Sequence, residues 1–272
     1  MFSGSGIIDK ENVSGIFEQP SDNNLVVFYT ASLPRGEDTE DLQSQCLAYS
    51  TDGGIRWTKY DNNPVIPNPD LPCYRDPKVI WIEEANHWIL LVTHGQSIGF
   101  YKSTNLTSWE LVSEFGEKEG LHTKGPWECP DMFPLTAADG TRKWVLVVGI
   151  GDGCAAPGSG TQYFVGEFDG EKFVNDNAPE TILYLDNGRD YYATQSWFNA
   201  PDNKRIGISW MSNWRYARDT KTKTYRSIMS LPKEYSLVKN IAGQYIVAQK
   251  FAEQINDEFA PASAINKNHF AC

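Results

Sequence analysis

The sequence has few cysteines, a deficit of positive charge and no long apolar run, and each of these absences excludes a class of protein. Five cysteines in 272 residues are too few for a disulfide scaffold, and no pair has the spacing of a zinc site. With 24 Lys and Arg against 35 Asp and Glu, the formal charge of −11 repels phosphate groups, which argues against nucleic acid or an anionic membrane as partner. No apolar run is long enough to cross a bilayer.

The first residues also lack the basic and apolar regions of a signal peptide. Two glycosylation tripeptides, Asn12-Val13-Ser14 and Asn105-Leu106-Thr107, nevertheless fit a secreted glycoprotein. The sequence therefore leaves two alternatives open, a cytoplasmic protein and a chain that has lost its beginning.

Helical periodicity is absent, whereas strand patterns rich in aromatic residues fill the chain. Nine Trp, 13 Tyr and 13 Phe are residue types that both β-sheets and sugar-binding surfaces favour. Residues 24–30 and 45–50 read as a hairpin, and similar units recur at 98–103, 163–168 and 191–198. This repetition predicts an all-β fold and favours a β-propeller over the alternative, a sandwich of stacked hairpins.

Two short carboxylate motifs lie at the same point of this repeat. Arg75-Asp76-Pro77 and Glu128-Cys129-Pro130 are 53 residues apart, and each follows an aromatic residue. Alone, each motif is typical of an ordinary turn. Together they predict two acids at the shared end of successive sheets, and two acids that flank one bond are the arrangement of glycoside hydrolysis.

Six stretches of the chain, within roughly residues 1–240, resemble glycoside hydrolase family 32, the invertases and exo-inulinases, and most closely its fungal members. The similar segments are Phe2-Ser3-Gly4-Ser5 with Asp9, residues 74–79, residues 127–131, residues 188–193, residues 210–214 and residues 225–232. The resemblance implies a five-bladed propeller that carries the active site and a C-terminal β-sandwich. It also implies hydrolysis of β-fructofuranosyl bonds in sucrose or fructans with retained configuration, without a metal or cofactor. The parent enzyme of such a chain is expected to be secreted, and a homodimer is an open possibility for it.

The resemblance assigns roles to particular residues. Glu128 is similar to the general acid/base, and Asp76 to the carboxylate that stabilises the transition state. The expected substrate-binding residues are Arg75, Phe2, Ser3, Asp190, Tyr191 and Trp214. Arg75 is expected to hold a sugar hydroxyl and to keep the neighbouring carboxylates ionised.

One departure from the family concerns the nucleophile. The family's nucleophilic Asp lies in an Asn-Asp-Pro-Asn segment upstream of Phe-Ser-Gly-Ser, and no such segment occurs here. Asp9 follows that motif and does not match. We therefore expect a fragment with residues 1–245 as a propeller whose first blade is incomplete, and with residues 246–272 as a linker and the start of a sandwich that is essentially missing. Such a chain is expected to be inactive by itself.

Two other functions stay open at this stage. A related five-bladed propeller acting on arabinan also uses three acids, although it should lack the Phe-Ser-Gly-Ser and Arg226-Ser-Ile-Met-Ser-Leu-Pro stretches. A non-catalytic carbohydrate-binding propeller is favoured by the missing nucleophile. Activity on sucrose and on arabinan, with the upstream segment restored, separates the three.

Overall fold

The computed structural model describes residues 1–37, 39, 41–253 and 255, and the chain within these ranges is almost entirely β. Its strands form four sheets, in each of which consecutive strands pair antiparallel. Three short 3₁₀ helices, η1 (Glu83–Ala85), η2 (Pro201–Asn203) and η3 (Ala217–Asp219), lie in the connections. None of the helices in this part of the chain has the length and apolar character that a membrane crossing requires.

The sheets follow one another along the chain. The first contains β1 (Phe2–Ile8), β2 (Leu25–Leu33), β3 (Leu42–Ser50) and β4 (Thr58–Lys59). The second contains β5 (Tyr74–Ile82), β6 (His87–His94), β7 (Ile98–Ser103) and β8 (Glu110–Phe115). The third contains β9 (Trp127–Thr136), β10 (Arg142–Ile150), β11 (Gly160–Phe168) and β12 (Phe173–Asn175), with β13 (Leu183–Tyr184) also paired to β11. The fourth contains β14 (Tyr192–Ser196), β15 (Arg205–Trp210), β16 (Lys233–Lys239) and β17 (Tyr245–Phe251).

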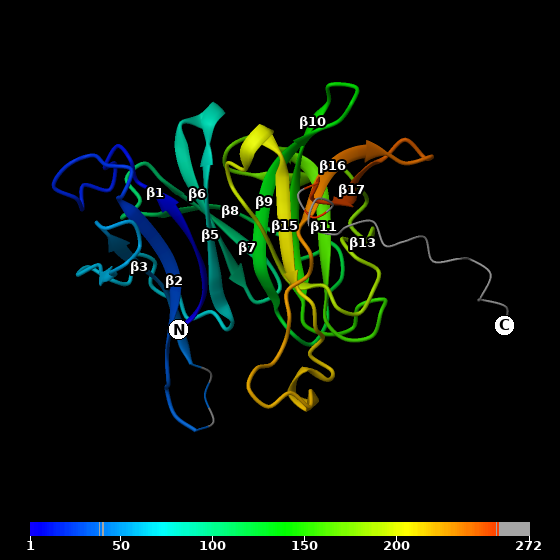
Figure 1. Cartoon of the computed structure of the whole chain (residues 1–272), viewed down its shortest axis with the longest axis horizontal. Helices are drawn as coiled ribbons and strands as arrows, with labels where there is room; N and C mark the ends of the chain where they lie inside the picture. Colours follow the sequence, from blue (N-terminus) through cyan, green and yellow to red (C-terminus); the bar gives the residue numbers. More distant parts are fainter. Residues whose placement is uncertain (38, 40, 254, 256–272) are drawn as a thin grey trace.

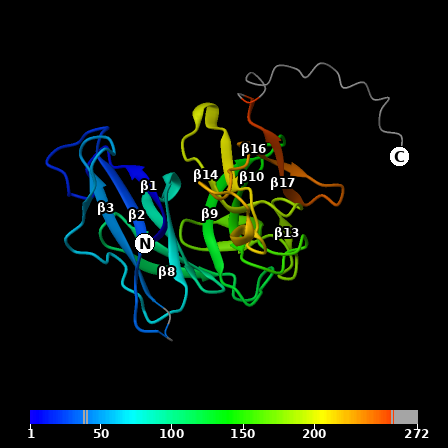
Figure 2. The same cartoon turned by 60° about the horizontal axis from the view of Figure 1, so that its bottom comes forward.

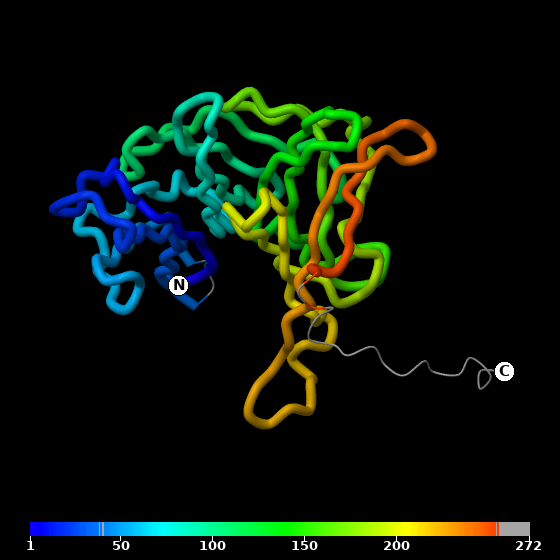
Figure 3. The backbone as a smooth tube through the Cα atoms, turned by 45° about the horizontal axis from the view of Figure 1, so that its top comes forward, coloured from blue at the N-terminus to red at the C-terminus, as the bar shows by residue number. Residues whose placement is uncertain are grey.

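The four sheets are arranged in an arc, with the first and the fourth at its two ends (Figures 1 and 3). The turned view keeps this order, from the blue β1–β3 on one side to the yellow and orange β14–β17 on the other (Figure 2). The first strand of each sheet contacts the first strand of the next sheet: β1 meets β5, β5 meets β9, and β9 meets β14. These first strands therefore form the inner wall of the arc, as in a propeller.

The alternation of side chains explains why the strands of the second and third sheets have continuous apolar sequences. Successive residues of a strand point to opposite faces. Leu90 packs into the core between the first and second sheets, while its neighbour Ile89 packs into the core between the second and third. In the third sheet, Leu146 joins that same second core and Val147 joins a third core shared with the fourth sheet. Both faces of these sheets are thus buried, one against each neighbour.

The expected five blades with an incomplete first blade are wrong for the described chain, which shows four sheets. The segment Phe2–Ile8 pairs with β2 in register and is itself the first strand of the first sheet, so that sheet has its four strands. The repeat pattern in the sequence did not identify β1 as a strand of the first sheet, because β1 is rich in glycine and mostly exposed rather than apolar.

The fourth sheet extends beyond the expected domain boundary at residue 245. β17 pairs along its whole length with β16, which places residues up to Phe251 in the propeller. The start of a sandwich stays a prediction, because residue 254 and residues 256–272 lie outside the described residues.

Candidate active site

The inner strands of the second, third and fourth sheets share a bulge at the same position. The register shifts between Arg75 and Lys78 in β5, opposite Val147 and Gly149 in β9, and between Tyr192 and Gln195 in β14. At each bulge one residue has a left-handed backbone: Asp76 with φ 63°, Cys129 with φ 50° and Ala193 with φ 51°. Bulges of this kind redirect side chains and are common next to active sites.

The bulges align the two motifs residue by residue, with the same 53-residue offset that separates them in the sequence. Since Asp76, Cys129 and Ala193 are equivalent, the preceding residues Arg75, Glu128 and Tyr192 are equivalent too. The two acids therefore come from successive positions of the repeat, one residue out of phase. They meet because the sheets are neighbours in the arc.

Glu128 is held by donors from both neighbouring sheets. Arg75 donates to its Oε1 from Nη2 at 2.9 Å and from Nε at 3.3 Å, and the Tyr192 hydroxyl donates to its Oε2. Charge-assisted donors on one oxygen and a hydroxyl donor on the other together orient the carboxylate. The Glu128 side chain keeps 24% of its surface exposed, so it remains accessible from outside.

Asp76 is fixed by the backbone on both sides. Its Oδ2 accepts from the backbone N–H of Cys129 at 2.9 Å, and its own N–H donates to Thr30 Oγ1 at 3.0 Å. Burial raises the pKa of the Asp76 carboxyl above its usual range; the Cys129 N–H and the Arg75 guanidinium oppose this rise, and the charge of Glu128 adds to it. The two carboxylates thus influence each other electrostatically in one site.

Two further groups in the site stay protonated at neutral pH. Burial raises the pKa of the Cys129 thiol well above its ordinary value, and the charges of Asp76 and Glu128 raise it further. The thiol is therefore a poor nucleophile. Burial and the charge of Glu128 likewise raise the pKa of Tyr192, which keeps its hydroxyl as a donor to that carboxylate.

A layer of buried polar side chains lies two residues further along each inner strand. Lys78 forms an ion pair with Asp131, with Nζ and Oδ1 3.1 Å apart, and also donates to Gln195 Oε1 at 3.0 Å. Asp131 accepts from the N–H and the hydroxyl of Ser196 at 2.7 and 2.6 Å. The layer ties the second, third and fourth sheets together directly behind the acids.

The first sheet contributes fewer side chains to the candidate site than its Phe2-Ser3-Gly4-Ser5 motif predicts. The ring of Phe2 lies 6.0 Å from the Arg75 guanidinium carbon, which places it beside the site. Ser3 is exposed, and its side chain forms no hydrogen bond among the described residues. Ser5 joins the sheets instead, because its hydroxyl donates to Pro77 O at 2.9 Å and accepts from the Val79 N–H at 2.8 Å.

The remaining predicted binding residues, Tyr191, Asp190 and Trp214, lie in different places in the structure. Tyr191 lies in the core between the third and fourth sheets, where its hydroxyl shares a 2.9 Å hydrogen bond with that of Tyr235, so it does not line the site. Its neighbour Tyr192, which the sequence did not single out, takes that place. Asp190 accepts from the Tyr216 hydroxyl, and Trp214 is half-exposed beside a pocket.

No third acid of the described chain joins the pair in a matching motif. Asp9 is buried at 1% exposure and caps its own turn, accepting from the Val13 N–H at 2.8 Å and from Ser14. The expected absence of a nucleophile segment therefore stays a prediction that the contacts of Asp9 support. Within the same residues, no group of three or more metal-ligating side chains comes together.

Comparison with known proteins agrees with this geometry. The profile of the "Glycosyl hydrolases family 32 N-terminal domain" matches residues 1–249. The chain belongs to glycoside hydrolase family 32. It is 45% identical to the levanase of Bacillus subtilis (strain 168) over 251 residues, which are 91% of this chain and 36% of the levanase.

Solved structures of family members have the same fold. An exo-inulinase from Aspergillus awamori superposes with a TM-score of 0.80 at 37% identity, covering 92% of this chain and 52% of that one. A fructofuranosidase from Schwanniomyces occidentalis complexed with fructosylnystose gives a TM-score of 0.82 at 36% identity, covering 92% of this chain and 48% of that one. The chain thus spans between about a third and a half of the length of these relatives.

Proposed function

We propose that the protein to which this chain belongs hydrolyses terminal β-fructofuranosyl bonds of sucrose or fructans. The observation that carries the proposal is the convergence of Glu128 and Asp76 from neighbouring sheets, with Arg75 and Tyr192 as donors to Glu128. Two carboxyl groups beside one another are what glycosidic cleavage requires. The names of relatives, which include levanase, exo-inulinase and invertase, support the same substrate class.

In this proposal each group has a separate task. Glu128 protonates the leaving glycosidic oxygen and later takes a proton from the attacking water. Asp76 stabilises the positive charge that develops on the fructosyl ring, and its contact with the Cys129 N–H holds it in place. Tyr192 and Arg75 orient Glu128 through its two oxygens.

The reaction retains configuration if a third carboxylate supplies the nucleophile. Retaining enzymes place the nucleophile about 5 to 5.5 Å from the acid and form a covalent sugar intermediate. The described contacts leave Asp76 and Glu128 without such a partner, and we infer that the nucleophile comes from a segment beyond this chain. An extracellular exo-inulinase among the relatives supports secretion of the whole protein, and a homodimer or a second domain after Phe251 stays a prediction.

A chimaera tests this proposal. The segment of the Bacillus subtilis levanase that precedes the matched region is joined to this chain, and release of sugar from sucrose, inulin and arabinan is measured. Fructose release from sucrose or inulin, abolished by Glu128→Gln, is the expected result. Activity on arabinan alone supports the other furanosidase class. Binding of sugars without any turnover supports the non-catalytic propeller and overturns the proposal.

A further inference from the structure

The bulge of β5 gives Asp76 a backbone that its own sequence does not favour. The register between β5 and β6 shifts between Arg75 and Lys78, and Asp76, inside this bulge, has a left-handed backbone with φ 63°. A residue that precedes a proline, as Asp76 precedes Pro77, favours an extended backbone instead. Residues other than glycine keep a left-handed backbone only where surrounding contacts hold them. The contacts of the bulge therefore decide where the Asp76 carboxylate points.

Two buried side chains of the first sheet provide such contacts. Thr30 of β2 and Gln45 of β3 are direct partners in register, so their side chains lie on one face of the sheet, and both are fully buried. Thr30 Oγ1 accepts from the Asp76 N–H at 3.0 Å and donates its own hydrogen to Gln45 Oε1 at 2.8 Å. Gln45 Nε2 donates to Tyr74 O at 2.9 Å. The two side chains thus hold the backbone of β5 at residues 74 and 76.

The chemistry of the groups fixes the direction of these bonds. A backbone N–H can only donate, so the Thr30 oxygen accepts from Asp76, and the single hydroxyl hydrogen goes to Gln45. The Tyr74 carbonyl can only accept, so it binds the NH₂ group of Gln45 and leaves the amide oxygen for Thr30. Thr30→Val keeps nearly the same side-chain shape but leaves the Asp76 N–H and Gln45 Oε1 buried without these partners.

The Thr30–Gln45 pair is connected to the acid pair through the Asp76 carboxylate. Asp76 Oδ2 accepts from the N–H of Cys129, which is the equivalent bulge residue of the next sheet and follows Glu128. In two successive bulges, the N–H of the bulge residue therefore donates to a side chain of the preceding sheet. Thr30 stands at the first of these two steps. Because it is fully buried, it cannot itself contact a substrate.

We propose that Thr30, held by Gln45, is a positioning residue of the reaction: its hydroxyl holds the left-handed backbone of the β5 bulge and so aims the Asp76 carboxylate at the fructosyl ring. The inference deepens the proposed function and rests on it, because it takes Asp76 as the carboxylate that stabilises the transition state. A misplacement of about 1 Å in a catalytic site can cost about 100-fold in rate. The Thr30 hydroxyl therefore matters to the reaction although it touches no reacting atom.

The chain as it stands tests the positioning without turnover. The Cys129 amide proton donates to the Asp76 carboxylate, so its NMR chemical shift should change when that carboxylate ionises. The part of this pH titration that Asp76→Asn removes belongs to Asp76. In Thr30→Val, that part should lose most of its amplitude, because the carboxylate no longer stays in one place. Thr30→Ser keeps the hydroxyl and should retain the amplitude.

Ser103→Ala is the matched control for the loss of a buried hydroxyl. Ser103 Oγ likewise accepts from a backbone N–H, that of Leu106 at 2.8 Å. Ser103 pairs with Trp88 near the start of β6, whereas Arg75 pairs with Thr93 near its end, so the control lies at the other end of the second sheet. It should leave the Cys129 titration unchanged.

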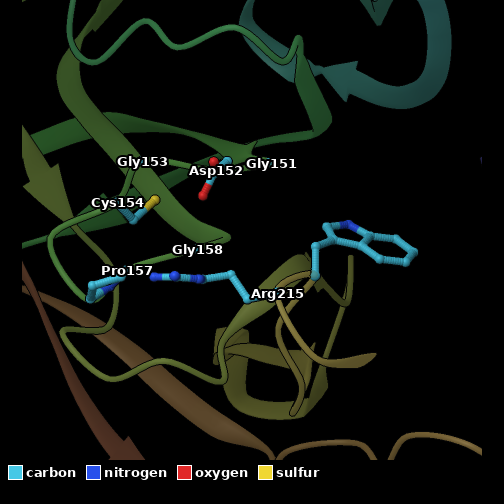
Figure 4. A pocket seen from close by; sticks show the side chains of 8 residues that line it. Gly151, Asp152, Gly153, Cys154, Pro157, Gly158 and Arg215 are labelled. Atoms are coloured by element: carbon cyan, nitrogen blue, oxygen red, sulfur yellow. The ribbon is translucent and has the colours of Figure 1, made fainter. Parts of the chain in front are cut away.

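Kinetics of the levanase chimaera test the consequence for the reaction. Thr30→Val should lower kcat by about 10- to 100-fold with little change in KM, at a temperature where the variant is still folded. Sucrose and an aryl fructoside should be affected alike, because Asp76 acts on the sugar and not on the leaving group. Thr30→Ser should restore most of kcat. Neither Thr30 nor Gln45 lines the pocket that includes Asp152 and Arg215, so the loss would not come from that pocket (Figure 4).

A Cys129 amide that titrates in Thr30→Val as in the wild type would overturn the inference. Equal losses of amplitude in Thr30→Ser and Ser103→Ala would also overturn it, because the effect would then be a general loosening. An active chimaera whose kcat does not respond to Thr30→Val removes the inference and keeps the proposed function. A chimaera without any turnover removes the proposed function and with it the role of Thr30 in the reaction, while the amide titration still decides whether the hydroxyl holds Asp76.

Discussion

At the residue scale, Asp76 shows how a buried carboxylate in the candidate site acts against stability. It is 6% exposed, and its pKa is raised by burial and by the charge of Glu128, with partial compensation from the Cys129 N–H and Arg75. A raised pKa in the folded state means that the fold binds the proton more tightly than the unfolded chain. Stability is therefore lost as pH rises through the range between the unfolded and the folded pKa, and the loss persists at neutral pH.

Replacing this charge should stabilise the fold. Asp76→Asn keeps an oxygen acceptor for the Cys129 N–H and removes the buried charge, so its melting temperature at neutral pH should rise by about 2 to 4 °C for each 1 kcal/mol gained. The gain should vanish in acid, where Asp76 itself is protonated. Thermal unfolding of both proteins from pH 3 to 7 measures it, and a variant that is less stable at every pH contradicts the argument.

Asp139 provides the opposite control. Lys239, the Thr141 N–H and Tyr245 hold its pKa well below the usual range, so its contribution is present above the unfolded pKa and disappears as pH falls. Asp139→Asn should therefore lower stability slightly at neutral pH and not in acid, and the effect stays small because the group is exposed.

Leaving-group dependence distinguishes the two acids. In the chimaera, Glu128→Gln should lower turnover of sucrose by about 10²- to 10⁴-fold, the usual contribution of a general acid. An aryl fructoside, whose leaving group needs no protonation, should lose much less in the step that releases it. Asp76→Asn should harm both substrates alike, because it acts on the sugar. Burst kinetics of the four combinations measure this, and equal losses for Glu128→Gln would count against its role as the acid.

Neighbouring tyrosines show what the sequence could not decide at this scale. The family resemblance of the segment that contains Asp190-Tyr191-Tyr192 predicts that Tyr191 binds substrate. Adjacent strand residues face opposite ways, and the bulge at Ala193 sets which of them faces inward. Tyr192 therefore reaches Glu128 while Tyr191 packs in the core. Short motifs marked Glu128, Asp76 and Arg75 in the sequence, and the structure brings these three residues together, while their roles stay predictions.

At the scale of elements, the layer of buried polar side chains behind the two acids holds the second, third and fourth sheets in register. Lys78 of β5 and Asp131 of β9 are almost fully buried, and both form hydrogen bonds with Ser196 of β14. This layer was not predicted from the sequence, because a Lys and an Asp 53 residues apart become neighbours only when the repeat aligns their strands. A buried charge without its partner is costly, whereas an exposed pair contributes little.

Breaking the buried pair should therefore destabilise the protein strongly. Asp131→Ala leaves Lys78 buried without its counter-charge and should lower the free energy of unfolding by about 3 to 5 kcal/mol. The comparison is Asp70→Ala, which removes the exposed pair with Arg35 and should cost less than about 1 kcal/mol. Urea unfolding of both variants gives the two values; similar losses would show that the buried pair does not fix the sheets.

At the scale of the whole molecule, the repeat predicted sheets in sequence order and the structure shows them. The expected number of blades was wrong because β1 (Phe2–Ile8) is a complete inner strand despite its glycines. The arc has a sheet at each end, and the strands of those end sheets present a face without a neighbouring sheet (Figure 3). Which segment completes the ring is a long-range property that local sequence patterns do not encode.

We propose that this chain supplies the acid and the stabilising carboxylate but not the nucleophile. Asp76 and Glu128 alone could act only as an inverting pair, which requires a gap of about 6.5 to 9.5 Å and a water between them. A chain extended by the segment that carries the nucleophile should act by retention.

The most direct measurement is time-resolved NMR of the sugar released from sucrose by residues 1–272 and by the levanase chimaera. The chain alone should release no fructose, and the chimaera should first release the β-anomer, with retained configuration. Release of the β-anomer by the chain alone would contradict the account, because the nucleophile would then lie among these 272 residues.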